Sequence, residues 1–342
     1  MTNSYKTKIK LSQGNEHPFA VYVRILGKGK TGSRSLSRLE ACDAMRMILA
    51  GLTTDVQLGA FLMLLRVKEE SCEELAGFVD AVRAHINLSN PITVHLDWSS
   101  YAGKKRQLPW FLLSAFLLAN HGIRVFMHGT SGHTEGRVYT ESVLQQLQIP
   151  IARNWSDVAQ QLDNTQFSFM PLQYLCPELQ KIIDLRGEFG LRSPVHTLSR
   201  LLNPLLADHS LQSVFHPSYS DSHQRAAELL GQPNAAVFKG EGGEIERKPE
   251  ANCVVKIVRH GKTTEELWDK MIDGRQEQPG SLNTQELVDV WIGKSENEYG
   301  KLAIIGTTAI ALKLIKVADS NTEALLKAEK LWDQRNKLQL LN

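Results

Sequence analysis

The chain has 342 residues, of which 42% are hydrophobic and 22% charged, so it has enough apolar material for a folded core and does not belong to the disordered class. We find no apolar run of the ~18 residues that a membrane span needs, and the polar stretch from Met1 to Lys10 does not resemble a signal peptide. The four cysteines are far apart, which argues against a disulfide framework or a zinc site. These features predict a cytoplasmic protein without a membrane partner.

Positive charge is concentrated near the N-terminus. The net charge of the chain is +2, yet residues 1–39 contain eight basic side chains and one acidic residue, Glu16. Such asymmetry is typical of a protein with an anionic partner, although a solvated polar tail has the same composition. We therefore treat residues 1–34 as a basic N-terminal segment.

Residues 35–90 have the pattern of a helical domain. Ser37-x-x-Glu40 and Ser71-x-x-Glu74 are capping boxes, in which a serine oxygen and a glutamate side chain satisfy the free amides at a helix start. Residues 56–65 are apolar nearly all round, which predicts a helix buried on every side. We expect this domain, with later helices, to form a dimer.

Residues 91–342 have the pattern of an α/β domain. Short β-branched runs at 92–96 and 123–127 flank a predicted helix from Pro109 to Asn120, and this βαβ unit implies a parallel sheet. Further strands are predicted at 167–170, 235–238 and 253–258. Helices are predicted from the Thr263-x-x-Glu266 pattern, at 302–315 and at 322–338. The expected fold is α/β, with an N-terminal helical domain packed against a larger α/β domain that has a mainly parallel central sheet.

The loop after the first predicted strand is the first candidate site. Lys104, Lys105 and Arg106 precede the N-terminus of a predicted helix, where free amides and the helix dipole favour an anion. The pattern predicts a phosphate site, with a solvated basic loop as the alternative. Trp98 and Tyr101 share this loop and are candidates for stacking on unpaired bases.

The second candidate site lies between Arg24 and Arg38. It contains Lys28, Lys30 and Arg34 among glycines and small hydroxyl residues. Flexible backbone with spaced cations suits the phosphate chain of a nucleic acid, although a basic loop without any ligand has the same appearance.

Histidines and acids give weaker signals. His128 and His133 flank a glycine turn, but no acid or cysteine stands at a spacing that indicates a catalytic triad. Glu241, Glu244 and Glu246 are compatible with either a metal site or a polar hairpin turn.

Several of these segments resemble the anthranilate phosphoribosyltransferase family, which is glycosyltransferase family 3 and has the class III fold of nucleoside phosphorylases and phosphoribosyltransferases. The similarity covers roughly residues 35–335 and implies a helical domain beside an α/β domain, with a homodimer formed through the helices. The matching segments, in order, are Leu36–Ala41, Gln57–Lys68, Glu73–Phe78, His128-Gly129, Gly190–Arg192, Asn203-Pro204 and Gly240–Gly242.

The resemblance fails at the positions that carry the chemistry. The enzymes of the family hold the pyrophosphate of phosphoribosyl pyrophosphate with a Gly-Thr-Gly-Gly-Asp loop, which here is Ser99–Gly103. Their Asn-x-Ser-Thr phosphate segment falls on residues 109–112, which offer no side-chain oxygen, and their Lys-His-Gly-Asn-Arg segment falls on 127–131 and loses both cations. Their magnesium Asp-Glu pair falls on Glu244 and Ile245. Only Arg192, at the position that contacts the aromatic acid, is retained.

This pattern resembles non-catalytic family members that bind DNA or RNA without sequence preference. We expect a homodimer that binds nucleic acid along a basic groove between the lobes and holds single strands at least as well as duplex, with no catalytic residue, metal or cofactor. The expected phosphate-binding residues are Lys28, Lys30, Arg34, Arg38, Lys104, Lys105, Arg106 and Arg200.

The alternative is a phosphoribosyltransferase that uses magnesium and phosphoribosyl pyrophosphate on an unknown acceptor. In that case the resemblance implies that Arg192 holds an acid and that His128 and Gly129 lie near the ribose.

Overall fold

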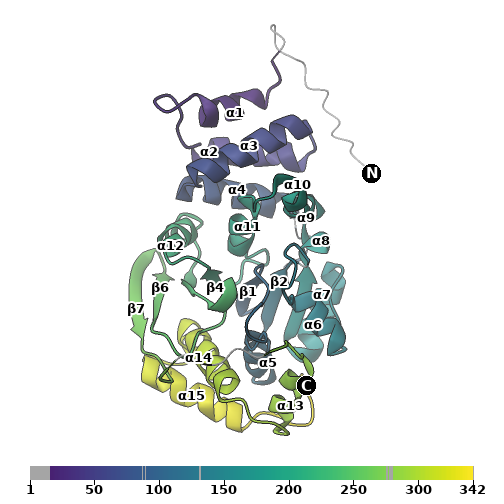
Figure 1. Cartoon of the computed structure of the whole chain (residues 1–342), viewed down its shortest axis with the longest axis vertical. Coiled ribbons are helices and arrows are strands. Elements are labelled where there is room, and N and C mark those ends of the chain that lie inside the picture. Colours follow the sequence, from purple (N-terminus) through teal and green to yellow (C-terminus); the bar gives the residue numbers. More distant parts are fainter. Residues whose placement is uncertain are drawn as a thin grey trace. The chain divides into compact units, whose positions relative to one another are not determined.

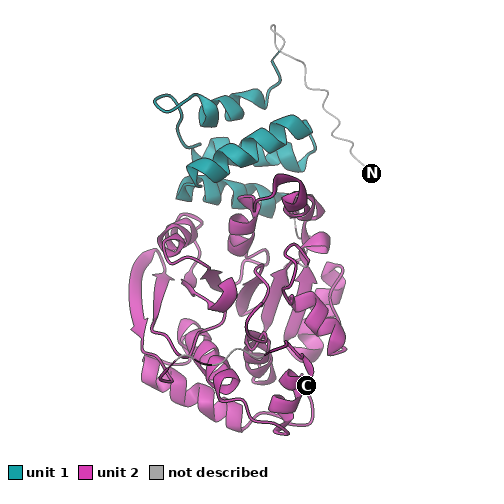
Figure 2. Ribbon diagram, in the orientation of Figure 1, with its two compact units in different colours: residues 1–85 teal, residues 86–342 magenta. Residues whose placement is uncertain are grey.

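The computed structural model describes residues 16–86, 88, 90–130, 132–274, 276 and 280–341. Two compact units make up the chain, residues 1–85 and residues 86–342 (Figure 2). Lys6, Lys8 and Lys10, which contribute to the expected basic segment, lie outside the described residues.

The first unit is helical. Its helices are α1 (Ala20–Gly27), α2 (Arg38–Leu49), α3 (Asp55–Lys68) and α4 (Cys72–Ile86), the last of which extends one residue past the boundary of the unit (Figure 1). Both predicted capping boxes are confirmed. Ser37 and Glu40 cap α2 reciprocally, and at the start of α4 the Ser71 amide donates to Glu74 at 2.7 Å. A third capping box, Thr54 with Gln57, begins α3.

Aromatic rings and one glycine set the packing of these helices. The Phe61 ring lies 5.2 Å from that of Phe19 and 6.1 Å from that of Phe78, measured between centroids. A Cβ atom at Gly77 would lie 2.2 Å from the carbonyl oxygen of Arg38, so only glycine allows α4 to approach α2 this closely.

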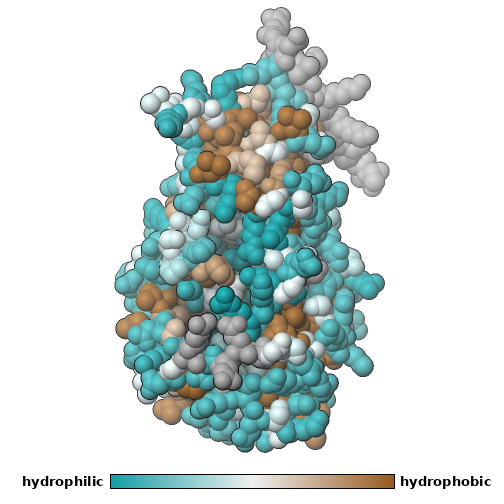
Figure 3. Space-filling model, viewed as in Figure 1, coloured by the Kyte–Doolittle hydropathy of each residue, from teal (hydrophilic) through white to brown (hydrophobic). Residues whose placement is uncertain are grey.

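The prediction that residues 56–65 are buried on every side is wrong for the single chain. Within α3 only Phe61, Leu62 and Leu65 are buried, whereas Val56 is 82% exposed and Val67, near the end of the helix, 86% exposed. A unit of a few short helices covers only one face of α3 and leaves an apolar face uncovered, and hydrophobic residues gather on this unit in the space-filling view (Figure 3).

The second unit is built on a seven-stranded sheet with the order β3-β2-β1-β4-β5-β6-β7. The first five strands in this order are parallel to one another. The pairing of β5 with β6 and that of β6 with β7 are antiparallel, so the expected mainly parallel sheet is confirmed. The strands are β1 (Leu96–Ser100), β2 (Val125–Gly129), β3 (Phe167–Pro171), β4 (His209–Val214), β5 (Asn234–Lys239), β6 (Cys253–Arg259) and β7 (Lys262–Trp268).

The helices of this unit lie between and after the strands (Figure 1). They are α5 (Phe111–Asn120), α6 (Thr140–Gln146), α7 (Trp155–Thr165), α8 (Leu172–Leu175), α9 (Pro177–Asp184), α10 (Arg186–Phe189), α11 (Val195–Leu198), α12 (Tyr219–Leu229), α13 (Gln285–Ile292), α14 (Glu298–Leu314) and α15 (Asn321–Asp333), with short 3-10 turns η1 (Ser199–Leu201) and η2 (Glu241–Gly243).

Two predicted elements differ from the structure. The first strand was expected at 92–96, but β1 begins at Leu96 and continues through Ser100, because its polar residues pair with strands on both sides. The expected helix at Thr263-x-x-Glu266 is strand β7, which pairs with β6 across a turn where His260 and Gly261 have φ angles of 44° and 76°.

The main core lies where α5 and α14 pack beside the sheet. The Ser114 hydroxyl in α5 donates to the carbonyl oxygen of Ile304 in α14 at 3.2 Å. A Cβ atom at Gly300 would lie 2.7 Å from the Trp110 ring, so glycine at this position lets α14 pack against the start of α5. Among the described helices, none has the length and hydropathy required to span a bilayer.

Candidate anion-binding site

The loops at the carboxyl ends of the parallel strands form the candidate site. β1 lies between β2 and β4, and the direction of chain progression across the sheet reverses at this point. In open α/β sheets such a switch point leaves a crevice in which ligands bind. The loop from Tyr101 to Trp110 follows β1 here and leads into α5.

Glu244 occupies the first part of this loop. One of its carboxylate oxygens, Oε1, accepts hydrogen bonds from the amides of Ala102 at 2.7 Å and Gly103 at 2.6 Å. Burial raises the pKa of Glu244, while the bond from the Gly103 amide and the charge of Arg200 oppose that shift. Adjacent backbone amides are a common anion-binding arrangement, and in this chain a carboxylate of the protein itself fills it.

Glu246 occupies the N-terminus of α5. Its Oε2 atom accepts the amide hydrogen of Phe111 at 2.9 Å, and its Oε1 atom lies 2.6 Å from the Lys104 ammonium group. Lys104 also pairs with Glu241, so one cation serves two carboxylates. Burial raises the pKa of Glu246 to about 7, against the opposing effect of Lys104. The positive end of this helix is therefore satisfied internally.

Lys104 is consequently not an exposed phosphate contact, which corrects the prediction. Its side chain is 0% exposed, because the loop folds back and buries it against the acids that follow β5. Burial disfavours its charged form, but the two carboxylates outweigh burial and raise the pKa of Lys104.

The two predicted stacking residues are also buried, so neither is accessible to a base. Trp98 lies within β1 and is 0% exposed, since the strand extends further along the chain than expected. Tyr101 is 1% exposed, and its hydroxyl lies 2.7 Å from Nδ1 of His128.

His128 and Gly129, the ribose-site candidates of the alternative, end strand β2 inside the sheet. His128 is fully buried, with Nε2 lying 3.3 Å from a carboxylate oxygen of Asp97. A Cβ atom at Gly129 would lie 2.1 Å from the carbonyl oxygen of Ser100, so this glycine is required by strand packing. Both residues have structural roles that explain their identity without a ligand.

Beside the filled loop lies a cavity of about 560 Å³ whose lining is rich in cations. Lys105 and Arg106 from the β1 loop line it together with Lys239 at the end of β5. These three side chains are exposed and form no ion pair among the residues that the structure describes. The remaining lining residues are Arg137, Phe215, His216, Pro217, Ser220, Gly240, Glu241, Gly242, Lys248, Ala251, Asn252, Cys253 and Val254.

Arginines are also concentrated around Arg192. Its Nη2 atom lies 3.4 Å from the Thr134 hydroxyl, to which Arg186 also donates. Burial, and then the charges of Arg137 and Arg200, lower the pKa of Arg192 to about 10. Burial lowers the pKa of Arg200 as well, although Glu244 opposes the shift. Arg200, a predicted phosphate contact, is thus not an exposed cation: its side chain is half-buried and lies near the Glu244 carboxylate.

In the helical unit the four predicted cations differ in their partners. Arg34 forms a two-pronged pair with Glu40 at 2.7 Å, and Arg38 pairs with Asp80 at 2.7 Å. Lys28 and Lys30 are exposed and, within the described residues, have no ion-pair partner. Lys28 and Lys30 are thus available for a ligand, whereas the arginines already neutralise carboxylates.

Sequence reasoning missed Arg137, Phe215 and Lys239. Arg137 donates to the carbonyl oxygens of Gly103 at 2.8 Å and Gly242 at 3.2 Å, and so ties two loops together. Phe215 follows β4, which the sequence did not reveal, whereas Lys239 ends β5 and directly follows the strand predicted at 235–238. Recognition of β4 as a parallel strand would have placed Phe215 at the ligand-binding edge of the sheet.

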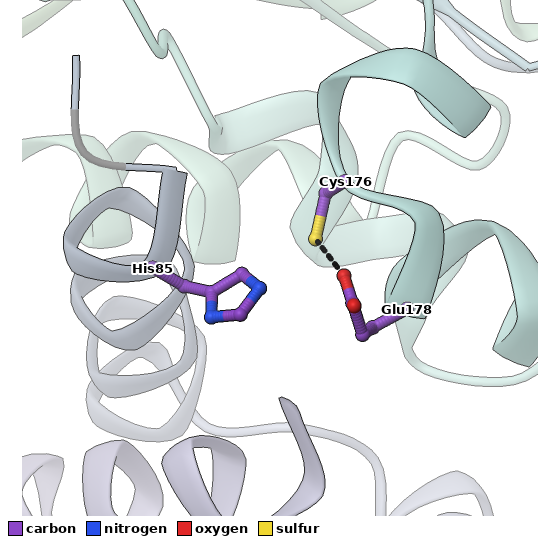
Figure 4. Close-up of side chains that lie close together, drawn as sticks. All are labelled: His85, Cys176 and Glu178. Atoms are coloured by element: carbon purple, nitrogen blue, oxygen red, sulfur yellow. Dashed lines mark hydrogen bonds between the residues drawn. The ribbon is translucent and has the colours of Figure 1, made fainter. Parts of the chain in front are cut away.

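A thiol outside this edge has a local partner. Cys176 directs its sulfur toward Glu178 of α9, at 3.8 Å (Figure 4). Burial raises the pKa of the Cys176 thiol to about 12. The thiol is therefore neutral, which argues against its use as a nucleophile.

Family models match both units. The helical bundle domain of a glycosyl transferase family matches residues 22–86, and the α/β domain of a glycosyl transferase family matches residues 111–334. An uncharacterized protein of Escherichia coli (strain K12), YbiB, is 31% identical over 276 residues, which are 79% of this chain and 85% of YbiB. An anthranilate phosphoribosyltransferase of Roseiflexus sp. (strain RS-1) is 31% identical over 234 residues, which are 67% of each chain.

Solved structures share the fold. Anthranilate phosphoribosyltransferase from Thermus thermophilus superposes with a TM-score of 0.74 at 22% identity, over 93% of this chain and 96% of that one. The Saccharomyces cerevisiae enzyme in complex with PRPP and Mg gives a TM-score of 0.75 at 19% identity, over 94% and 95%. From the matches of both domains and these homologues, the chain belongs to glycosyl transferase family 3, among the homologues of anthranilate phosphoribosyltransferase.

Proposed function

We propose that this chain is a non-catalytic family member that binds nucleic acid without strong sequence preference. The observation that carries the proposal is the distribution of acidic and basic side chains at the carboxyl edge of the sheet. Glu244 and Glu246 occupy the loop amides and the helix N-terminus, while Lys105, Arg106 and Lys239 stand exposed and unpaired beside them, within the part of the chain that the structure describes.

The filled loop disfavours a pyrophosphate ligand. A magnesium pyrophosphate depends on several charge-assisted hydrogen bonds and on a bridging metal. Here the loop amides already have an acceptor, and a phosphate at the start of α5 would face the carboxylate of Glu246. Two neighbouring negative charges repel each other strongly in a buried site, so this position disfavours the substrate of the enzymes.

The exposed cations favour an extended polyanion. Lys105, Arg106 and Lys239 come from two different loops of one unit, and Lys28 and Lys30 add positive charge to the other. Contacts from separate lysines and arginines neutralise successive phosphates and carry no base specificity. Nucleic acid, as the partner, accounts for this distribution better than a single small ligand.

The test is a salt series with labelled oligonucleotides, measured by fluorescence anisotropy. Each neutralised phosphate of a single strand contributes about −0.7 to the log–log slope of affinity on salt. The Lys105→Ala, Arg106→Ala, Lys239→Ala triple variant should therefore flatten the slope by about 2.

A matched control removes the same charge elsewhere in the unit. Lys262, Lys330 and Lys337 are exposed and do not line the cavity, so their triple alanine variant should keep the wild-type slope. Equal slopes for both triple variants, or the absence of any oligonucleotide binding by the wild type, would refute the proposal.

Phosphoribosyl transfer is the second candidate, and the arginines around Arg192 favour it. A half-buried guanidinium group surrounded by three others, Arg137, Arg186 and Arg200, attracts an anionic ligand such as an aromatic acid. Calorimetric titration with phosphoribosyl pyrophosphate and magnesium distinguishes the two candidates. Saturable binding, together with turnover that Arg192→Ala abolishes, would establish the transferase and exclude the non-catalytic proposal.

We also propose that the chain is a homodimer formed through its helical unit. Large apolar side chains are exposed on two helices of this unit. Leu39 on α2 is 78% exposed, and Val56 and Val67 on α3 are 82% and 86% exposed. Exposed apolar surface of this kind is typical of a protein–protein interface, and a second copy carries the same complementary apolar face.

A further inference from the structure

The cation-lined cavity also contains an aromatic side chain that the fold does not bury. Phe215 directly follows β4 and is 45% exposed, although its neighbours in the strand are buried. A Cβ atom at Gly243 would lie 3.4 Å from the Phe215 Cβ atom, so one side of this residue rests against the η2 turn. The His216 ring meets the Phe215 ring edge-on, with centroids 4.8 Å apart. Phe215 is thus held in place with part of its ring accessible.

The cavity has the size and polarity of a site for one nucleotide unit. Its volume of about 560 Å³ lies within the ~300–1,000 Å³ range of small-molecule sites. Val254, which is 46% exposed, adds apolar surface to the lining. An accessible ring beside unpaired cations is the arrangement that single-strand binding proteins use, with a base on the ring and phosphates on the cations.

The lining of the cavity contains more basic than acidic side chains. Glu241 is the acidic lining residue, and it already pairs with Lys104. Lys248 pairs with Glu250 at 3.0 Å but keeps 46% of its side chain exposed. Lys105, Arg106 and Lys239 therefore leave the cavity with a positive excess, which suits phosphates on either side of a bound base.

We propose that this cavity is a base-binding subsite for single-stranded nucleic acid, in which one unpaired base stacks on Phe215 while its flanking phosphates contact Lys105, Arg106 and Lys239. The inference rests on the proposed nucleic-acid binding and adds to it a second source of affinity. That source is independent of salt and absent for duplex DNA, whose bases are already stacked.

The test compares three ligands by fluorescence anisotropy: a 12-nucleotide oligothymidylate, the same strand with abasic units, and a duplex. Stacking of a base on an aromatic side chain contributes roughly 5- to 150-fold in affinity. Phe215→Ala should lose about that factor for the oligothymidylate, leave the affinity for the abasic strand unchanged, and keep the wild-type salt slope. Phe215→Trp should bind the oligothymidylate at least as tightly as the wild type.

Two further variants guard against a folding artefact. Phe215→Leu keeps the apolar contact with the η2 turn and should show the same loss as Phe215→Ala. Tyr174 in α8 is 40% exposed and does not line the cavity, so Tyr174→Ala is a matched aromatic control and should bind like the wild type.

Three outcomes would overturn the inference while leaving nucleic-acid binding intact. The first is a Phe215→Ala variant that binds the oligothymidylate as tightly as the wild type. The second is a wild type that binds the abasic strand equally well. The third is complete displacement of the strand by millimolar thymidine monophosphate, which would identify a mononucleotide site. If the wild type binds none of the three ligands, the proposed function fails together with the inference.

Discussion

Three consecutive cations, Lys104, Lys105 and Arg106, have different surroundings and therefore different roles. Lys104 is completely buried between two carboxylates, whereas Lys105 and Arg106 project into the cavity. Nothing in their sequence distinguishes them, because the acids that bury Lys104 lie more than a hundred positions away along the chain. Their separation into one structural side chain and two cavity-facing side chains is a property of the fold.

Removal of the Lys104 charge should destabilise the protein strongly. Lys104→Met leaves the buried Glu246 and the partly buried Glu241 without their cation, a change that typically lowers the free energy of unfolding by ~3–5 kcal/mol. Lys105→Met alters an exposed side chain and should change that free energy by no more than ~0.5 kcal/mol. Urea unfolding at pH 8 measures both, and equal losses in the two variants would contradict the structure.

The protonation of Glu246 should make stability depend on pH. Burial raises its pKa to about 7 in the folded protein from an ordinary value of 4.5. The folded state therefore binds this proton more tightly than the unfolded state, so the resulting stabilisation is complete below pH 4.5 and is lost as the pH rises through about 7.

Glu246→Gln removes this titration and keeps an oxygen that can accept the Phe111 amide hydrogen. Relative to the wild type, the variant should become more stable as the pH increases from 5 to 8, by on the order of 1–3 kcal/mol. Urea unfolding at the two pH values gives the difference. A difference that stays constant or decreases would show that Glu246 does not carry this proton.

At the scale of secondary structure, the sequence predicted the elements whose signals are local. The capping boxes of α2 and α4 and the apolar strands β5 and β6 are local features. β1 was displaced because Asp97, Ser99 and Ser100 are polar and have the appearance of a loop, and only pairing with β2 and β4 makes them strand residues.

In the candidate site, too, the local features were predictable from the sequence and the long-range contacts were not. The position of an anion site at the start of α5 was predictable from the helix N-terminus alone, and the cations of its loop were visible in the sequence. The sequence did not predict that Glu246 fills this position, because its hydrogen bond with the Phe111 amide joins residues 135 positions apart. The exposed Phe215 was missed for a related reason, since its place depends on β4, whose polar residues conceal the strand.

The capping box of α2 should have a measurable effect on stability. In Ser37→Ala the amide of Glu40 loses its side-chain acceptor, which typically lowers the free energy of unfolding by about 1 kcal/mol. Ser33→Ala is a nearby exposed control and should have little effect. Chemical denaturation followed by circular dichroism compares the two, and an equal response would argue against the cap.

At the scale of the whole molecule, the two units expose different surfaces. The helical unit leaves apolar side chains of α2 and α3 uncovered, while the α/β unit presents its cation-lined cavity at the carboxyl edge of the sheet. The proposed self-association and the proposed binding at the cavity therefore depend on different side chains and can be tested with separate variants.

The proposed homodimer can be tested by light scattering coupled to size exclusion. The wild type should have twice the 38.3 kDa mass of the chain. The Val56→Glu, Val67→Glu double variant places two charges on the apolar face of α3 and should have the mass of one chain. Leu326→Glu alters a 63% exposed residue of α15 and should remain dimeric. A monomeric wild type would refute the homodimer.

The buried group of Lys104, Glu241 and Glu246 also constrains how this protein can evolve. Replacement of the lysine leaves two acids without a cation, and replacement of both acids leaves a buried cation without an anion. An open, anion-accepting loop is therefore reached only through replacements that first leave a charge of this group without its partner. We expect relatives of this chain to keep Lys104, Glu241 and Glu246 together or to lack them together.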